Sequence, residues 1–287
     1  MRRLEGIGYA VLSSATFGLI PLFSIPLMNE GMGTNMVIFY RLLFAAVIMG
    51  ISGLIQKRSF KVDRQHWLSL LGFGSLYIFT ASVLLLSYHY IDSGVATTIH
   101  FLYPIVVTLI MVMFFDEKLT LTIIVSALLS VGGVALLCIG SGDSINLKGV
   151  LIALTTSFSY AFYIIRVNSS KAARIDAVIF TFYVLLSGAI VIFILSLFTQ
   201  GIQTIPSSWS WLNLLLLALL STVVSNFALV KAVKLVGSTI TSILGSMEPL
   251  TALTVGVFVF GEAFGVRSFA GILLVLISVY LVVKRSK

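Results

Sequence analysis

The chain has 287 residues, of which 59% are hydrophobic and only 10% are charged. Soluble domains carry about 25% charged residues, and the mean hydropathy of +1.12 is typical of proteins embedded in lipid. The composition therefore excludes a soluble enzyme, a nucleic-acid-binding module and a disordered protein. The net charge of +8 does not indicate nucleic-acid binding, because the basic residues fall in short loops between apolar runs. The single cysteine, Cys138, excludes an intramolecular disulfide and a cysteine-based metal site.

Ten long apolar runs follow one another along the chain. A helix needs about 20 predominantly apolar residues to cross a bilayer, whereas strands of a membrane barrel would alternate polar and apolar residues. The loops between the runs are too short to form a soluble domain. The sequence therefore predicts an all-α membrane protein with ten transmembrane helices, at 6–27, 34–55, 67–88, 94–115, 119–140, 147–166, 177–198, 211–231, 237–260 and 264–283.

The basic residues predict the orientation of these helices. Cytoplasmic loops are enriched in Lys and Arg. If the N-terminus is cytoplasmic, all 18 Lys and Arg except Lys148, Arg267 and Arg41 fall in cytoplasmic segments. Arg41 lies within a predicted span, so only two basic residues face outside. We therefore expect both termini in the cytoplasm.

The two halves of the chain resemble each other. The segment TIHFLYPIVVTLIMVMFFDEKL at 98–119 aligns with ILGSMEPLTALTVGVFVFGEAF at 243–264 without a gap, and this pairs Pro104 with Pro249 and Glu117 with Glu262. Each half holds five predicted helices, an odd number, so the second half is expected to sit inverted relative to the first. Inverted repeats are typical of secondary transporters, whose substrate site lies near the membrane midplane. The predicted repeats are 1–143 and 144–287.

These segments resemble a known family. MEPLTALTVGVFVFGE at 247–262 and FYRLLFAA at 39–46, together with the two Pro–Glu pairs, resemble the EamA-type ten-helix branch of the drug/metabolite transporter superfamily. The resemblance implies alternating access around a central cavity lined by helices 1, 3, 4, 6, 8 and 9. Members of the family move amino acids, nucleotide sugars, other metabolites and drugs, and many bacterial members are exporters.

Glu248 is the most informative residue, because it lies near the middle of a predicted span. An ionisable group there costs about 2.5–3.5 kcal/mol on insertion scales. One interpretation is a cavity carboxyl that binds a cationic group of the substrate or carries a proton. The alternative is a protonated side chain that hydrogen-bonds to a neighbouring helix. The repeat pairs Glu248 with Tyr103, and we expect both residues to face one cavity.

Pro104 and Pro249 are predicted helix kinks beside that cavity. Each removes one helical hydrogen bond, which would free the carbonyls of His100 and Gly245. Free carbonyls at membrane depth occur only where protein or water covers them, although a kink that serves packing alone is an equal alternative. His100 titrates near neutral pH in its ordinary state, which suits a proton-linked role, but a structural hydrogen bond is the alternative. No second His or Cys lies near it, so no metal site is predicted.

Polar and aromatic side chains in other spans complete the candidate site. Arg41 either extends to the surface, pairs with a structural carbonyl, or holds a substrate carboxylate. Thr80 and Asn226 are candidates for helix–helix hydrogen bonds or for substrate contact. Aromatic residues of spans 1 and 6 either pack the bundle or contact the substrate. The candidate substrate-binding residues are Glu248, Tyr103, His100, Phe101, Asn226, Thr80, Phe17, Phe158, Tyr163 and Arg41.

Enzymatic alternatives have little support in the sequence. GSGD at 140–143 matches the GxGD pattern of intramembrane aspartyl proteases, but Asp143 falls in a polar loop and Asp92 at a span end. No P-loop, Asp-rich diphosphate motif or potassium-channel filter occurs. No catalytic residue, cofactor, metal, ATP or nucleic-acid partner is therefore expected.

The sequence thus predicts a multi-pass secondary transporter of the cytoplasmic (inner) membrane, with the lipid bilayer and a small-molecule substrate as its partners. The first cargo to consider is an amino acid or related compound, moved by export. The alternatives are a multidrug or hydrophobic-cation exporter and a carrier of nucleotide-related metabolites. Protons are a candidate coupling ion, and facilitated diffusion or exchange remains the alternative to proton coupling.

Overall fold

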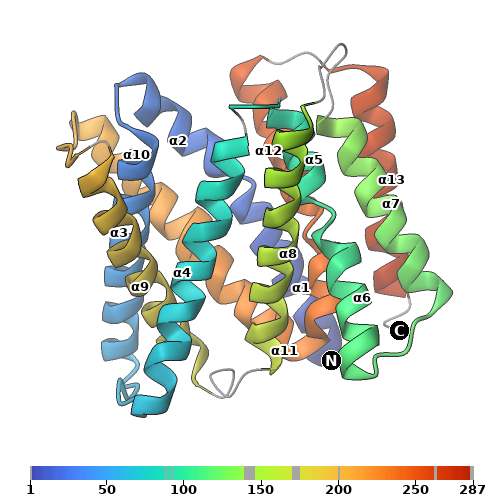
Figure 1. Cartoon of the computed structure of the whole chain (residues 1–287), viewed down its shortest axis with the longest axis horizontal. Coiled ribbons are helices and arrows are strands. Elements are labelled where there is room, and N and C mark those ends of the chain that lie inside the picture. The colour runs from blue at the N-terminus through green and yellow to red at the C-terminus, as the bar shows by residue number, and fades with distance from the viewer. Residues whose placement is uncertain are drawn as a thin grey trace.

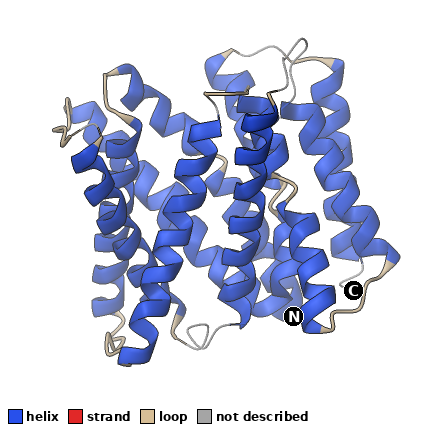
Figure 2. Ribbon diagram, viewed as in Figure 1, coloured by secondary structure: helices blue, strands red, loops and turns tan. Residues whose placement is uncertain are grey.

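The structure is a computed structural model, and it describes residues 2–87, 89–91, 93–138, 146–169, 175–199, 201–261 and 264–284. These parts of the chain are helices and short loops without strands, as Figure 2 shows. The helices of the first half are α1 (Arg2–Phe17), α2 (Ile20–Asn29), α3 (Thr34–Ile55), α4 (Arg64–Ser87), α5 (Ser93–His100), α6 (Tyr103–Phe115) and α7 (Leu121–Cys138).

The second half begins with two long helices and continues through a helix of mixed type. The long stretch that starts at α10 passes through a π-helical segment, η2, before α11. The elements are α8 (Leu147–Ser169), α9 (Ala177–Phe198), α10 (Ser208–Ala218), η2 (Leu219–Val224), α11 (Ser225–Leu244), α12 (Met247–Phe260) and α13 (Val266–Lys284). Within α11, Gly237 has φ 83° and ψ 172°, which divides this helix in two. Only glycine adopts such a backbone readily.

The apolar helices match the predicted runs in position. In the described part of the chain, eight helical stretches are long and apolar enough to cross a membrane. Two shorter apolar helices, Leu121–Leu136 and Met247–Phe260, lie within the predicted runs 119–140 and 237–260. Large apolar side chains such as Phe258 and Phe198 are more than four-fifths exposed, as expected for a surface that faces lipid.

Three predicted spans are interrupted rather than continuous. The chain breaks between α1 and α2 at Gly18–Leu19, between α5 and α6 at Phe101–Leu102, and between α11 and α12 at Gly245–Ser246. Pro104 and Pro249 lie in the first turns of α6 and α12, where a helix needs no backbone donor. The prolines therefore begin new helices, whereas the sequence predicted kinks within continuous ones.

The expected free carbonyl of Gly245 is a second correction. This carbonyl accepts a hydrogen bond of 3.0 Å from the backbone N–H of Glu248. The short turn at the break thus supplies the donor that Pro249 cannot.

The internal repeat extends to backbone conformation. Helices α6 and α12 are both followed by a left-handed residue, Asp116 (φ 53°) and Gly261 (φ 69°). The two N–H groups bond to the carbonyls of Met111 and Gly256 respectively. All these residues pair at the register of the sequence alignment. Glu262, the repeat partner of Glu117, lies outside the described residues, as does the GSGD segment.

The helices pack as one bundle (Figure 1). The most extensive contacts join α1 to α11, α7 to α13, and α3 to α9, while α4 packs against both α8 and α9. In the view of Figure 1, α3 and α9 lie at one side, α7 and α13 at the other, and α1, α8 and α11 between them. Helix α1 begins and α13 ends at the same end of the bundle.

Candidate substrate pocket

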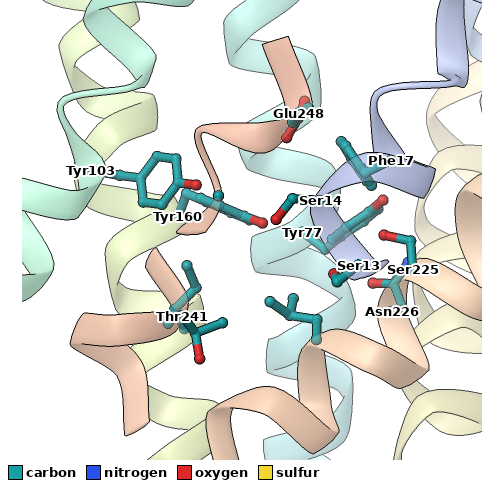
Figure 3. A pocket seen from close by; sticks show the side chains of 13 residues that line it. Ser13, Ser14, Phe17, Tyr77, Tyr103, Tyr160, Ser225, Asn226, Thr241 and Glu248 are labelled. Carbon is teal, nitrogen blue, oxygen red and sulfur yellow. The ribbon is translucent and has the colours of Figure 1, made fainter. Parts of the chain in front are cut away.

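A cavity lies where the three interrupted spans meet in the middle of the bundle (Figure 3). Its walls come from α1, α4, α6, α8, α11 and α12, which belong to the six spans that the family resemblance places around a cavity. The lining residues are Ser13, Ser14, Phe17, Tyr77, Tyr103, Tyr160, Ile164, Ser225, Asn226, Leu229, Thr241, Gly245 and Glu248.

Glu248 is the acidic residue of this lining. It is the second residue of α12 and follows the helix break directly, so its carboxyl lies at the positive end of the helix dipole, which favours a negative charge. The side chain is partly exposed to the cavity. Among the described residues, no hydrogen-bond or salt-bridge partner of this carboxyl is found. A carboxyl without a partner at such a place is available to a ligand.

Tyrosine rings form the wall beside Glu248. The ring of Tyr103 meets the ring of Tyr160 edge-on, with centroids 4.7 Å apart. Tyr160 in turn stacks on Tyr163 at 6.1 Å, and Tyr163 contacts Tyr77 at 6.0 Å. The faces of such rings attract cations. A carboxyl beside tyrosine rings is therefore suited to a cationic group.

A polar part of the lining, from α1 and α11, supplies hydrogen-bond acceptors. The Ser14 hydroxyl donates to the Ala10 carbonyl (2.8 Å) and the Thr241 hydroxyl donates to the Gly237 carbonyl (2.7 Å). The Asn226 amide nitrogen donates to the Thr222 carbonyl (2.9 Å). The two hydroxyl protons are used in these bonds, the Asn226 amide keeps a second N–H, and oxygen lone pairs of all three side chains remain for the cavity. This wall also favours a ligand that donates hydrogen bonds.

Glycine at position 245 is required by the close approach of Tyr103. A Cβ at Gly245 would collide with the Tyr103 hydroxyl oxygen and would lie 2.8 Å from the Ser242 carbonyl oxygen. The contact joins α6 of the first half to the helix break of the second half. Tyr103 and Glu248, which the repeat pairs, are thus both lining residues of one pocket.

Arg41 lies behind the pocket wall and is only 8% exposed. Its Nε donates to the Thr222 hydroxyl (2.6 Å), and its Nη2 lies 3.2 Å from the Tyr77 hydroxyl and 3.4 Å from the Ser221 carbonyl. Its guanidinium carbon lies 5.2 Å from the centroid of the Phe17 ring. Extension to the membrane surface is therefore wrong, and pairing with structural groups is what the structure shows.

The π-helical segment η2 positions these partners of Arg41. The Thr222 hydroxyl donates to the carbonyl of Leu217, five residues earlier (3.0 Å). The wider turn brings the Thr222 hydroxyl and the Ser221 carbonyl to the guanidinium. Such π-helical turns within α-helices are frequent at functional sites. The sequence contains no signal that predicted this turn.

Of the candidate residues, Glu248, Tyr103, Phe17 and Asn226 line the pocket. His100 lies behind the tyrosine wall, with its Nδ1 2.9 Å from the Thr156 hydroxyl and its ring against Tyr103 and Tyr160. The Thr80 hydroxyl lies 2.7 Å from the Ser159 hydroxyl, a helix–helix contact. The structure places six candidates outside the lining: His100, Phe101, Thr80, Phe158, Tyr163 and Arg41.

The exposed fractions of three of these residues show where their side chains lie. Phe101 is 2% exposed and Tyr163 is 1% exposed, and both belong to the apolar core. Phe158 is 46% exposed on α8. It lies five positions before Tyr163, and a helix of 3.6 residues per turn sends these side chains in different directions.

Sequence reasoning missed most of the small polar lining. Ser13, Ser14 and Tyr77 carry no motif that marks them as pocket residues. One signal was available, because Ser225 pairs with Thr80 in the repeat alignment and precedes Asn226. Tyr160 is one of the aromatic residues of span 6 for which substrate contact was an alternative, and it lines the pocket. The other lining residues outside the candidate set are Ser13, Ser14, Tyr77, Ile164, Ser225, Leu229, Thr241 and Gly245.

Comparison with known proteins identifies the family. No curated protein matches the chain. Among the solved structures that match, one described only as "Crystal structure of protein" has a TM-score of 0.81 at 15% identity, over 98% of this chain and 98% of that chain. At this identity the likeness shows the fold alone. The EamA-like transporter family matches residues 4–139 and again 147–284, and the chain therefore belongs to this family of multi-pass membrane proteins.

Proposed function

We propose that the protein is a secondary transporter that moves a small organic metabolite across the cytoplasmic membrane. The observation that carries this proposal is the Glu248 carboxyl, which has no partner among the described residues and faces a central pocket at a helix break. Family members are drug and metabolite transporters. An ionisable side chain within a membrane span is costly and therefore points to a function.

The proposed architecture is ten crossings in two inverted repeats, 1–143 and 144–287, with cytoplasmic termini. Three facts support it: the two family matches, the equivalent helix ends at Asp116 and Gly261, and the asymmetric Lys and Arg distribution. The ten predicted runs alternate consistently with that asymmetry.

The proposed mechanism is alternating access around the pocket. Breaks within helices are the natural hinges, because hinge residues at the ends of elements absorb the changes in φ and ψ. The three breaks at Gly18–Leu19, Phe101–Leu102 and Gly245–Ser246 all border the pocket. Movement of the short helices beyond these breaks would open the pocket to one side and then the other.

The proposed cargo class is an amino acid or related compound, moved by export. Glu248 with the rings of Tyr103 and Tyr160 suits an ammonium group, and the acceptor-rich wall suits a hydrogen-bond donor. The second candidate is a hydrophobic cation, because the same three side chains would also bind a drug-like amine. A nucleotide-related metabolite would need more positive charge than the lining carries.

Solute counterflow in proteoliposomes tests the proposal. Vesicles loaded with an unlabelled amino acid mixture should accumulate labelled amino acids, whereas empty vesicles should not. Glu248→Gln should lower the initial rate at least tenfold, because it removes the only carboxylate of the lining. The matched control is Glu5→Gln, which changes an exposed glutamate at the start of α1. No counterflow with amino acids or organic cations, in protein shown to be folded, would contradict the proposal.

Proton coupling is tested in the same vesicles. An imposed pH gradient should drive accumulation of the transported compound if Glu248 exchanges a proton. Accumulation that does not respond to the gradient would favour exchange or facilitated diffusion.

A further inference from the structure

Arg41 is a buried cation that forms no salt bridge with any residue that the structure describes. It is 8% exposed, and all the groups that it hydrogen-bonds are neutral: two hydroxyls and one carbonyl. The salt bridges found in the described parts of the chain are Arg58–Asp176 and His66–Asp63, both elsewhere. Buried charges in proteins are normally paired with an opposite charge. No carboxylate among the described residues is hydrogen-bonded or salt-bridged to Arg41, so a ligand carboxylate would meet an unpaired guanidinium.

The wall between Arg41 and the pocket is one side chain thick. Phe17 and Tyr77 both line the pocket, and both contact the guanidinium: the Phe17 ring at 5.2 Å and the Tyr77 hydroxyl at 3.2 Å. Phe17 is the last residue of α1, directly before the break at Gly18–Leu19. A small movement at this break would displace the ring and expose the guanidinium to the pocket.

The pocket lining carries the complementary charge. Glu248 lines the same pocket as Phe17 and Tyr77, the two side chains that contact Arg41, and Glu248 and Arg41 form no salt bridge. A ligand that bridges them needs an anionic group at Arg41 and a cationic group at Glu248. Arginine binds carboxylates through two parallel hydrogen bonds, and the tyrosine rings beside Glu248 suit an ammonium group.

We propose that Arg41 is the specificity-determining residue that binds the carboxylate of a zwitterionic substrate once the Phe17 ring has moved aside. This inference rests on the proposed function, because it assumes that the substrate occupies this pocket. It predicts that the protein distinguishes an amino acid from the amine that lacks only the carboxylate.

Binding of matched probes to the purified protein in detergent tests the inference. The first set is L-leucine, 3-methylbutylamine and 4-methylpentanoate. The second set is L-tyrosine, tyramine and 3-(4-hydroxyphenyl)propionate. In at least one set the wild-type protein should bind the zwitterion at least tenfold more tightly than the amine. In Arg41→Gln the ratio of zwitterion to amine affinity should fall close to one, while the dissociation constant of the amine changes less than twofold. The control Arg166→Gln, which removes an exposed arginine of α8, should preserve the ratio.

A second variant covers the case in which Arg41→Gln does not fold. Phe17→Ala retains Arg41 and removes the ring that separates it from the pocket. The ratio of zwitterion to amine affinity should rise at least threefold in this variant. An unchanged ratio, or a ratio that persists in folded Arg41→Gln, would overturn the inference.

The outcomes separate this inference from the proposed function. Amine binding that depends on Glu248, without any advantage for the zwitterion, would reject the carboxylate role of Arg41 and leave the transporter proposal in its organic-cation form. No binding of any probe by the folded wild-type protein would overturn both proposals for this pocket.

Discussion

Polar residues in the spans of this protein differ in whether the bundle supplies them with a partner. Thr80 and His100 have hydroxyl partners on α8, namely Ser159 and Thr156. Glu248 has no such partner in the described structure and faces the pocket. The first kind stabilises helix packing, and the second kind is available to a substrate. The sequence alone gives both kinds the same polarity and depth, so only their surroundings separate them.

Thr80→Val tests the structural kind. The variant loses the hydroxyl contact with Ser159, but the Ser159 hydroxyl keeps its bond to the Thr156 carbonyl at 3.1 Å. Helix–helix hydrogen bonds in membranes contribute about 0.6 kcal/mol on average. We expect a small decrease in melting temperature and unchanged counterflow. Thr155→Val, which removes an exposed hydroxyl of α8, is the matched control. Loss of counterflow in a stable Thr80→Val protein would instead show that Thr80 contacts the substrate.

At the scale of elements, the interrupted spans determine where the pocket forms. The break at Gly18–Leu19 lies against the first turn of α12, because a Cβ at Gly18 would collide with the Glu248 carbonyl oxygen and lie 2.8 Å from the Thr251 Cβ. Glycine thus allows α1 to approach the backbone that carries the Glu248 side chain. A residue with a side chain at this position would keep the two helix ends further apart.

Gly18→Ala should therefore displace α12 from α1. Overpacking of this kind costs about 1–3 kcal/mol, and the displacement of Glu248 should lower counterflow at least tenfold. Gly8→Ala is the matched control, because Gly8 lies on α1, the helix that ends one residue before Gly18, and an added Cβ there meets no atom within 4 Å. That variant should retain counterflow and melt at the same or a higher temperature. Equal activity of the two alanine variants would contradict the proposed role of the close approach.

A second link between elements joins the end of α2 to the start of α10. The Glu30 carboxyl accepts hydrogen bonds from the Ser210 and Ser207 hydroxyls. These bonds, that of Ser210 first, lower the pKa of the Glu30 carboxyl from its ordinary value of 4.5. A lowered pKa in the folded protein means that the link is fully stabilising above the unfolded pKa and is lost as the pH falls through the folded pKa.

We expect part of the acid destabilisation of this protein to come from Glu30. Melting temperatures of the wild type and of Glu30→Gln, measured in detergent between pH 7 and pH 3, should converge as the pH falls below about 4.5. The wild type should melt higher only at the upper end of this range. Glu5→Gln controls for the loss of an exposed carboxyl. A constant difference between wild type and Glu30→Gln across the whole range would contradict the assignment.

At the scale of the whole molecule, most of what could be predicted of the fold and the pocket came from the apolar runs and the internal repeat. The apolar runs gave the helices to within a few residues, since a membrane span must be long and apolar. The repeat pointed to Glu248 and Tyr103, which both line the pocket. The direction of individual side chains could not be predicted from the sequence. Phe158 and Tyr163 lie on the expected helix, but neither lines the pocket. The π-helical turn that holds Arg41 was also unpredicted, because it depends on contacts between distant segments.

The orientation of the whole bundle in the membrane can be tested with single cysteines. Replacement of Cys138 with Ala gives a background without cysteine. The positive-inside rule predicts that Ser59, in the loop with Lys57 and Arg58, faces the cytoplasm, and that Thr204, between α9 and α10, faces outside. Both residues are exposed. In intact cells, a membrane-impermeant thiol reagent should label Thr204→Cys at once and label Ser59→Cys only after permeabilisation. The reverse pattern would invert the bundle, whereas labelling of both positions in intact cells would contradict an odd number of crossings between them.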